Sequence, residues 1–148
     1  MADRIFDASA LVKTVLPEPG SDRVGKLLTE AADGLTHVYV LDIAVVESVN
    51  VIWKRQQRRD IGPQEALEAL QQLDRVLDLI TIVRSRPHLR RGLEIGMALS
   101  LAIYDSVVVA CAEADGLTML TEDSRQAETA SQLSPPVQVE LLGPESDA

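Results

Sequence analysis

The chain has 148 residues, of which 46% are apolar and 25% charged, and it carries a net charge of −9 at pH 7. This length suits a single domain with its own core, and the composition excludes an intrinsically disordered chain. One cysteine excludes an internal disulfide, and Cys111 lies in an apolar run where we expect a small buried residue. There is no signal-peptide pattern and no apolar run near the roughly 18 residues of a membrane span, so we expect a cytoplasmic protein without a membrane partner.

The first half of the chain alternates short apolar runs, typical of buried strands, with segments of helical period. The expected strands are Arg4–Phe6, His37–Leu41 and Leu79–Val83. The expected helices are Ala8–Lys13, Ser21–Ala32, a long helix from about Asp42 to Arg59, and an amphipathic helix after Gly62 and Pro63 that extends to Leu77. Ser21 and Asp42 are of residue types that commonly cap helix N-termini.

The second half continues the alternation. The expected helices begin at Pro87, cover Val107–Ala114 and cover Arg125–Gln132, and the expected strands are Leu117–Thr121 and, at a sheet edge, Val137–Leu142. Strands separated by helices indicate crossover connections, so we expect one α/β domain over residues 1–142 with a mainly parallel sheet covered on both faces. Residues 143–148 are expected to form a frayed polar tail.

Four acids lie where this arrangement would bring them to one end of the sheet. Asp7 follows the first strand, Asp123 follows the strand Leu117–Thr121, and Glu47 and Asp105 lie among apolar residues. Open parallel sheets bind ligands beyond the carboxyl ends of their strands. The three aspartates could each instead cap a helix, and that interpretation stays open. Glu47 is about five residues into its helix, where burial of an unpaired carboxylate is costly, so a shared site is the favoured hypothesis.

Several carboxylates in one pocket repel each other unless a cation compensates their charge. Mg²⁺ and Mn²⁺ prefer oxygen ligands, whereas the sequence offers no Cys or His cluster for zinc, since His37 and His88 are isolated in it. A carboxylate-bound ion would activate water for in-line attack on a phosphodiester, and a second ion about 4 Å away would stabilise the leaving oxygen. Such hydrolysis requires no side-chain nucleophile.

Four motifs resemble the PIN-domain toxins of VapBC toxin-antitoxin systems: Phe6–Lys13, Val46–Asn50, Ile103–Ala112 and Met119–Asp123. The resemblance covers nearly the whole chain. It implies a three-layer α/β/α sandwich, a magnesium- or manganese-dependent endoribonuclease that acts as the toxin of a type II pair, a homodimer, and inhibition by a small cognate antitoxin.

The resemblance also assigns site residues. It places Asp7, Glu47 and Asp105 at the family's three central acidic positions and Asp123 at the fourth, with Ser9 as a small hydroxyl residue that assists near the first acid. Glu122 is a rival for Asp123, because strand alternation would send the two side chains to different sides. We favour Asp123.

RNA contact would depend on phosphates, because the aromatic content is 3% and offers no stacking platform. The segment from Lys54 to Arg91 is net positive, with nine basic against five acidic residues. The candidate RNA-binding residues are Lys54, Arg55, Arg58 and Arg59, which equally suit a solvated helix end, and a second group is Arg84, Arg86, Arg90 and Arg91.

Two other enzyme classes place acids at strand ends, and both are disfavoured. Phosphotransferases with an Asp-x-Asp motif need an acid where this chain has Ser9. Phosphoacceptor receiver domains need an acidic pair near the first strand and a lysine after a late one, and the chain has neither. The alternative that stays open is a catalytically silent PIN-like module that binds RNA or protein.

Overall fold

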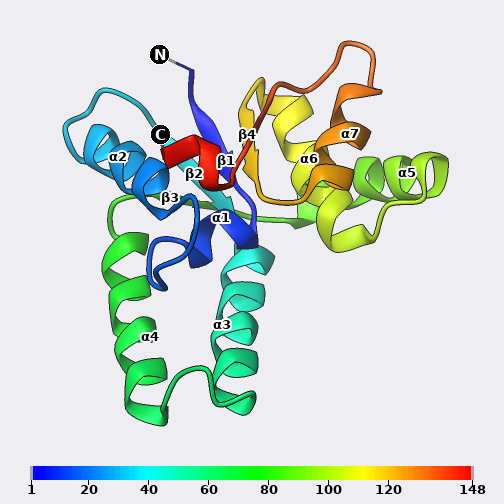
Figure 1. The fold of residues 1–148 in the computed structure, drawn as a ribbon. Coiled ribbons are helices and arrows are strands. Elements are labelled where there is room, and N and C mark those ends of the chain that lie inside the picture. Colours follow the sequence, from blue (N-terminus) through cyan, green and yellow to red (C-terminus); the bar gives the residue numbers. More distant parts are fainter. Residues whose placement is uncertain (1, 148) are drawn as a thin grey trace.

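Residues 2–147 are described by a computed structural model in which five strands form one sheet with the order β3-β2-β1-β4-β5 (Figure 1). The strands are β1 (Arg4–Phe6), β2 (Val38–Leu41), β3 (Thr81–Val83), β4 (Thr118–Thr121) and β5 (Val139–Leu141). All four neighbouring pairs are parallel. The mainly parallel α/β sheet expected from the sequence is therefore confirmed.

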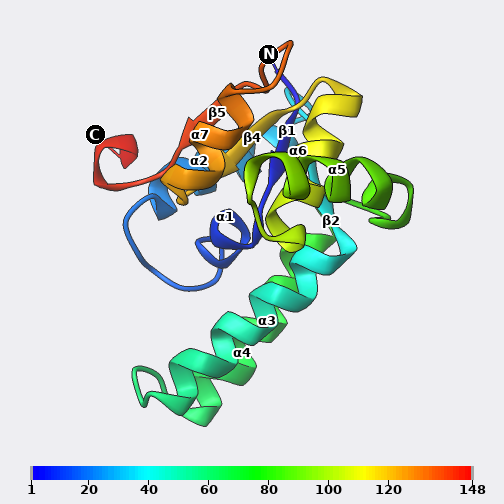
Figure 2. The same cartoon turned by 90° about the vertical axis from the view of Figure 1, so that its right-hand side faces the viewer.

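Seven α-helices and two short 3-10 helices lie within the described residues. They are α1 (Ala8–Val12), α2 (Ser21–Ala32), α3 (Asp42–Gln57), α4 (Pro63–Leu77), η1 (Arg86–His88), α5 (Leu89–Leu99), α6 (Ile103–Asp115), α7 (Ser124–Ser131) and η2 (Pro144–Asp147). Figure 1 shows α6 and α7 on one side of the sheet and α2 on the other, which is the three-layer arrangement. The paired helices α3 and α4 project from this body as an arm (Figures 1 and 2).

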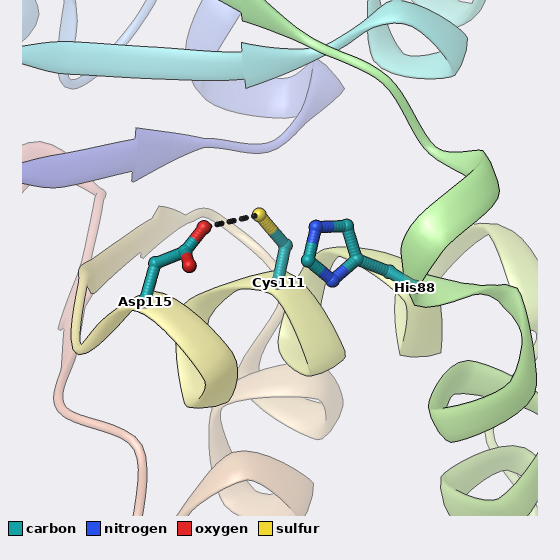
Figure 3. A group of neighbouring side chains, drawn as sticks. All are labelled: His88, Cys111 and Asp115. Carbon is teal, nitrogen blue, oxygen red and sulfur yellow. Dashed lines mark hydrogen bonds between the residues drawn. The ribbon is translucent and has the colours of Figure 1, made fainter.

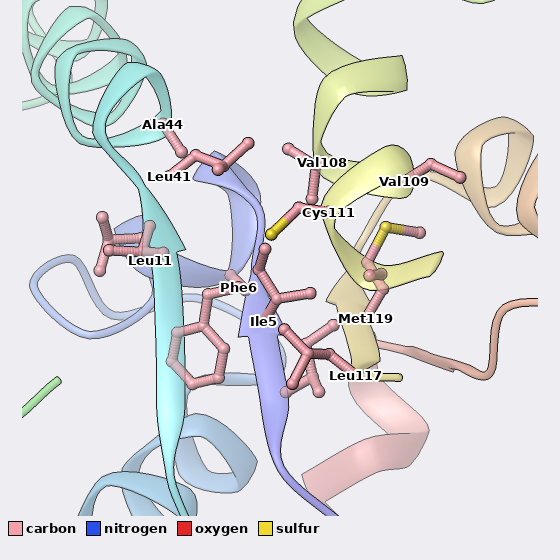
Figure 4. Packing of buried hydrophobic residues seen from close by; sticks show 14 of the residues in the cluster. Ile5, Phe6, Leu11, Leu41, Ala44, Val108, Val109, Cys111, Leu117 and Met119 are labelled. Atoms are coloured by element: carbon pink, nitrogen blue, oxygen red, sulfur yellow. The ribbon is translucent and has the colours of Figure 1, made fainter. Parts of the chain in front are cut away.

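The core is formed where α6 packs on the centre of the sheet. Successive side chains of a strand point to opposite faces, so Ile5 and Phe6, both fully buried, divide between the two faces of β1. Figure 4 shows Ile5 and Met119 facing α6, whereas Phe6 points away from it. The helix α6 buries every residue from Ser106 to Ala112. This burial fixes the position of the first turn of α6 relative to the sheet.

Two glycines allow α5 to approach α6 closely. A Cβ atom at Gly92 would lie 2.7 Å from Cγ2 and 3.1 Å from the Cα atom of Val107. A Cβ atom at Gly96 would lie 2.9 Å from the backbone oxygen of Leu101. Because these residues are one helical turn apart, they form one face of α5 against the start of α6.

The prediction of a frayed C-terminal tail is wrong for residues 144–147, which form η2. The Asp147 carboxylate accepts the backbone N–H of Gly20 at 2.8 Å and that of Arg23 at 2.9 Å, so it caps the start of α2. The expected cap, Ser21, is instead the first residue of α2, and the N-cap is Gly20, whose φ of 96° favours glycine. Similarly, α3 begins at Asp42 and its N-cap is Leu41.

No single helix among residues 2–147 is both long and apolar enough to cross a membrane. The segments Arg86–Leu99 and Ile103–Asp115 satisfy the length and composition criteria only as a pair, and they are bent by 116° relative to each other.

Candidate active site

The four acids predicted to form a site are brought to one edge of the sheet. Asp7 directly follows β1 and Asp123 follows β4, the parallel neighbour of β1. Glu47 lies in the second turn of α3, which begins at the end of β2, and Asp105 lies in the first turn of α6. Their charges act on each other, since Asp105 raises the pKa of both Asp7 and Glu47, and Asp123 raises the pKa of Asp105.

Asp7 is the most buried of the four, with 7% of its surface exposed. Its Oδ1 accepts the Ser9 hydroxyl at 2.6 Å and the backbone N–H of Ala10 at 2.9 Å, so Asp7 also caps α1. Burial raises the pKa of Asp7, although its hydrogen bonds oppose the shift. The cap interpretation therefore applies to Asp7, whereas its place in a metal site stays a prediction. Ser9 contacts this first acid, as the family resemblance implies.

Thr121 connects three parts of the site through one hydroxyl group. Its oxygen accepts the backbone N–H of Asp123 at 3.0 Å and lies 2.9 Å from the side-chain oxygen of Gln126 and 2.5 Å from Oδ2 of Asp7. The Gln126 amide nitrogen donates to the backbone oxygen of Asp105 at 3.1 Å, which directs its own oxygen toward Thr121. A hydroxyl carries one hydrogen, so Thr121 donates to either Asp7 or Gln126 at one time. Its donation to Asp7 favours the ionised carboxylate, which opposes the effect of burial on the pKa of Asp7.

Glu47 and Asp105 are half-buried, and burial is the main cause that raises the pKa of each carboxyl group. The neighbouring carboxylates raise both pKa values further. Asp105 is not the cap of its helix, because α6 begins at Ile103, four residues earlier than predicted, with Ala102 as N-cap. Its place in the first turn still suits an acid, since the helix dipole favours negative charge there.

Asp123 and Glu122 have different surroundings. The Oδ1 atom of Asp123 accepts the backbone N–H groups of Arg125 at 2.9 Å and Gln126 at 3.3 Å, which caps α7. The carboxylate of Glu122 instead pairs with the Lys13 ammonium group. The charge of Asp123 acts on Asp105, whereas the charge of Glu122 is paired with Lys13.

Lys13 belongs to a charged network beside the four acids, and this network was not predicted from the sequence. Its ammonium group lies 2.8 Å from Glu18 as well as against Glu122, and its side chain is 1% exposed. Burial alone would lower the pKa of Lys13, but the hydrogen bonds to Glu122 and Glu18 raise it, so the group stays charged. Glu18 also pairs with Arg55. Nothing local in the sequence indicates this network, whereas the Asp123-x-x-Gln126 spacing is a helix-capping pattern that could have indicated Gln126.

A cleft of about 420 Å³ opens beside the carboxylates. Its lining combines site residues with members of the charged network: Ser9, Val12, Glu18, Val51, Arg55, Glu122 and Asp123. Of the four acids, Asp123 lines this cleft, and Arg55 places a cation in its wall.

The other candidate RNA-binding residues lie farther along the arm. Lys54, Arg58 and Arg59 are exposed where α3 ends, about 10 Å or more from Glu47 along the helix axis. Arg55 differs from them, because it is half-buried and paired with Glu18. In the second basic group, Arg91 makes two hydrogen bonds to Glu113, at 2.7 and 3.0 Å.

The expectation that His88 is isolated is wrong. It is half-buried at the end of η1, where its ring lies near Cys111 and Asp115 of α6, and these three residues could hold a metal ion. The packing of η1 and α5 on α6 makes this group, so no sequence spacing indicates it. Cys111 itself is fully buried, as predicted.

The four carboxylates suit a hard divalent cation. All their donor atoms are oxygens, the ligands that hard divalent cations prefer. Burial raises the pKa of Asp7, Glu47 and Asp105, and neighbouring carboxylates raise all three further. Lys13, the buried cation nearby, is already paired with two other acids.

The chain matches the model of the PIN domain over residues 4–132. It belongs to the PIN domain family. This PIN protein is 27% identical over 124 residues to ribonuclease VapC3 from Pyrobaculum aerophilum. The aligned residues cover 84% of this chain and 92% of VapC3. Its fold is similar to PAE2754 from the same organism, with a TM-score of 0.67, 21% identity, and coverage of 86% of this chain and 79% of that one. The fold is also similar to that of VapBC2 from Rickettsia felis bound to a promoter DNA fragment, with a TM-score of 0.68 and 14% identity. That match covers 94% of this chain and 98% of the other chain.

Proposed function

We propose that this PIN protein is a divalent-metal-dependent endoribonuclease and the toxin of a toxin-antitoxin pair. The observation that carries the proposal is the placement of Asp7, Glu47, Asp105 and Asp123 at one edge of the sheet, where their charges act on one another. The similarity to ribonuclease VapC3 supports RNA as the substrate.

The four carboxylates would hold Mg²⁺ or Mn²⁺. A bound cation of this kind polarises a phosphodiester and supplies a nucleophile by lowering the pKa of water. The chain's own residues prepare that site: Ser9 and Thr121 orient the Asp7 carboxylate, and Gln126 joins Thr121 to the backbone of Asp105. Asp7, Glu47 and Asp105 lose their protons when they act as ligands, since ligating carboxylates are ionised.

RNA would enter through the cleft that Ser9, Arg55 and Asp123 line. Its phosphates would contact Arg55 and, farther along α3, the exposed side chains of Lys54, Arg58 and Arg59. A phosphate that binds Arg55 has to compete with Glu18, which holds that guanidinium group in the free protein.

Cleavage of RNA by the purified protein tests the proposal. We expect cleavage with Mn²⁺ or Mg²⁺, none with a chelator, and a loss on the order of 100-fold or more in Asp105→Asn. Asp74→Asn is the matched control, because it neutralises an exposed acid of α4 outside the site and should keep full activity.

Two results would contradict the proposal. Cleavage that survives in Asp105→Asn would contradict the site. RNA binding without cleavage under every metal condition would favour the catalytically silent binding module instead.

We also propose a homodimer. Large apolar side chains are exposed on α5, at the start of α6 and on α3: Val46, Leu89, Leu93, Met97, Ile103 and Tyr104. Part of this surface is a groove of about 420 Å³ with an almost entirely apolar lining. Exposed apolar surface of this kind typically contacts a partner, and a second copy agrees with the family resemblance.

The groove between α3 and α4 is the proposed antitoxin site. It measures about 330 Å³ and is lined by Val49, Ile52, Trp53, Gln56, Pro63, Ala66, Leu67 and Leu70. An apolar groove between helices suits an amphipathic segment, and Arg or Lys in that segment would pair with the acidic site. Trp53 is the only tryptophan and is 55% exposed, so antitoxin binding should shift its fluorescence to shorter wavelength. An unchanged spectrum in the complex would place the antitoxin elsewhere.

A further inference from the structure

A second group of metal-ligating side chains lies at the opposite end of α6 from Asp105. Cys111 and Asp115 are one turn apart on this helix, and His88 ends η1, the short helix before α5. One donor atom of each residue lies within 4.8 Å of the others, and Figure 3 shows the three side chains converging. Asp105 and Asp115 are ten residues apart, or about 15 Å along the helix axis, so this group is separate from the carboxylate site.

Asp115 places a negative charge at the carboxyl end of α6. It is the last residue of α6, and the helix dipole disfavours an acid at that end. The last turn of α6 holds no basic residue, and Arg91, which packs there from α5, is bound to Glu113. The Asp115 carboxylate accepts a hydrogen bond from the thiol of Cys111, at 3.7 Å. A bound cation would compensate both the carboxylate and the helix end.

We propose that His88, Cys111 and Asp115 bind a zinc ion, with water as the fourth ligand. A nitrogen, a sulfur and an oxygen donor form a set that zinc accepts and that Mg²⁺ does not. Tetrahedral zinc bonds of 2.0–2.3 Å place neighbouring donors roughly 3.3–3.8 Å apart, and the Cys111 to Asp115 contact already has this spacing. Only the His88 ring has to adjust toward the other two.

The thiol has to ionise when zinc binds. Burial, with Asp115 beside it, raises the pKa of Cys111 to about 12, so the metal-free thiol keeps its proton. Zinc deprotonates a coordinating thiol outright, and that proton leaves to solvent. The affinity of the site is therefore expected to rise with pH.

The zinc ion would join η1 to the end of α6. The short helix η1 leads directly into α5, which packs closely on α6. This packing positions the first turn of α6, which carries Asp105. The site would act as a structural clamp that stabilises the folded protein by mass action. The zinc site takes no part in RNA hydrolysis, so its test is independent of the test of the proposed nuclease activity.

Binding of Co²⁺, a spectroscopic substitute for zinc, tests the site in the intact protein. Cys111 is the only cysteine, so a thiolate-to-cobalt charge-transfer band in the near ultraviolet can come only from this residue. We expect the band in the wild type, its loss in Cys111→Ser, and its bleaching by zinc. Cobalt at the four carboxylates gives no such band. Saturating Co²⁺ without a charge-transfer band would overturn the proposal.

The two histidines provide a matched pair of variants that leave the core intact. His88→Gln should weaken Co²⁺ binding by about 10-fold or more, a loss typical of a disrupted metal shell, whereas His37→Gln should match the wild type. With Mg²⁺ saturating the carboxylates, zinc should raise the melting temperature of His37→Gln but not that of His88→Gln. Equal shifts in the two variants would show that zinc acts at another place and would refute the site.

Discussion

Asp7 caps a helix and is also the most buried acid of the proposed metal site. Its Oδ1 atom holds the first turn of α1 while Oδ2 contacts Thr121, so the carboxylate is fixed in position before any ligand arrives. The cost of this placement is burial, which raises the pKa of Asp7, and the same cause acts on Glu47 and Asp105. The protonation of these groups therefore links pH to metal binding.

The raised pKa values determine how the stability of the protein depends on pH. A carboxyl group whose pKa is raised in the folded state contributes stability at low pH, and this contribution is lost as the pH rises through the raised pKa. Metal-free protein should lose this contribution between acidic and neutral pH, and a bound cation should restore it. We therefore expect Mn²⁺ to raise the melting temperature more at about pH 7.5 than at about pH 5. An equal or larger shift at the lower pH would contradict the assignment of the shifted carboxyl groups to the metal site.

At the scale of elements, the contact between α5 and α6 decides where Asp105 lies. Gly92 faces the backbone of Val107, two residues after Asp105, with no room for a methyl group. Any side chain at this position has to push the two helices apart. The carboxylate site is thus sensitive to a residue that is not part of it.

Gly92→Ala tests this contact. Alanine is favoured over glycine in a helix by about 1 kcal/mol, so without a clash this substitution would raise the free energy of unfolding. The clash with Val107 should instead lower the free energy of unfolding, measured with urea, by about 1–3 kcal/mol. Gly25→Ala is the control, since Gly25 lies within α2 and has nothing within 4 Å of its added Cβ atom. It should stabilise the protein by about 0.5–1 kcal/mol. Stabilisation by both substitutions would show that α5 and α6 do not depend on this glycine.

The order and type of the elements could be predicted because apolar periodicity is a local property of the sequence. The first turn of α6 could not, since Ile103 and Tyr104 are exposed and interrupt the buried pattern that marks the rest of the helix. The cap that Asp147 supplies to α2 joins residues from opposite ends of the chain. Contacts of this kind have no local signal.

The acids of the candidate site could be predicted from the sequence, but their partners could not. The acids follow apolar strands or interrupt apolar helices, so each was visible in the sequence by itself. Strand alternation predicted that the side chains of Glu122 and Asp123 diverge, but the pairing of Glu122 with Lys13, which is remote in sequence, could not be predicted. The group of His88, Cys111 and Asp115 escaped notice for the same reason.

The whole molecule leaves an apolar surface on α5 uncovered, with Met97 the most exposed residue at 70%. If a second copy covers this surface, a charge at its centre should separate the copies because an ionised carboxylate in an apolar interface is costly. We expect Met97→Glu to be monomeric by light scattering at concentrations where the wild type is dimeric. Leu35→Glu, at a residue 60% exposed in the loop after α2, should stay dimeric. A dimeric Met97→Glu variant would contradict the assignment of this surface.

The central claim is that four carboxylates form one metal site, and the Mn²⁺ binding isotherm measured by calorimetry tests it most directly. We expect saturable binding in the wild type, binding weakened by about 10-fold or more in Asp105→Asn and Asp123→Asn, and near wild-type binding in Glu122→Gln, whose carboxylate pairs with Lys13. Binding that is unchanged in Asp105→Asn, or lost in Glu122→Gln and kept in Asp123→Asn, would contradict the account.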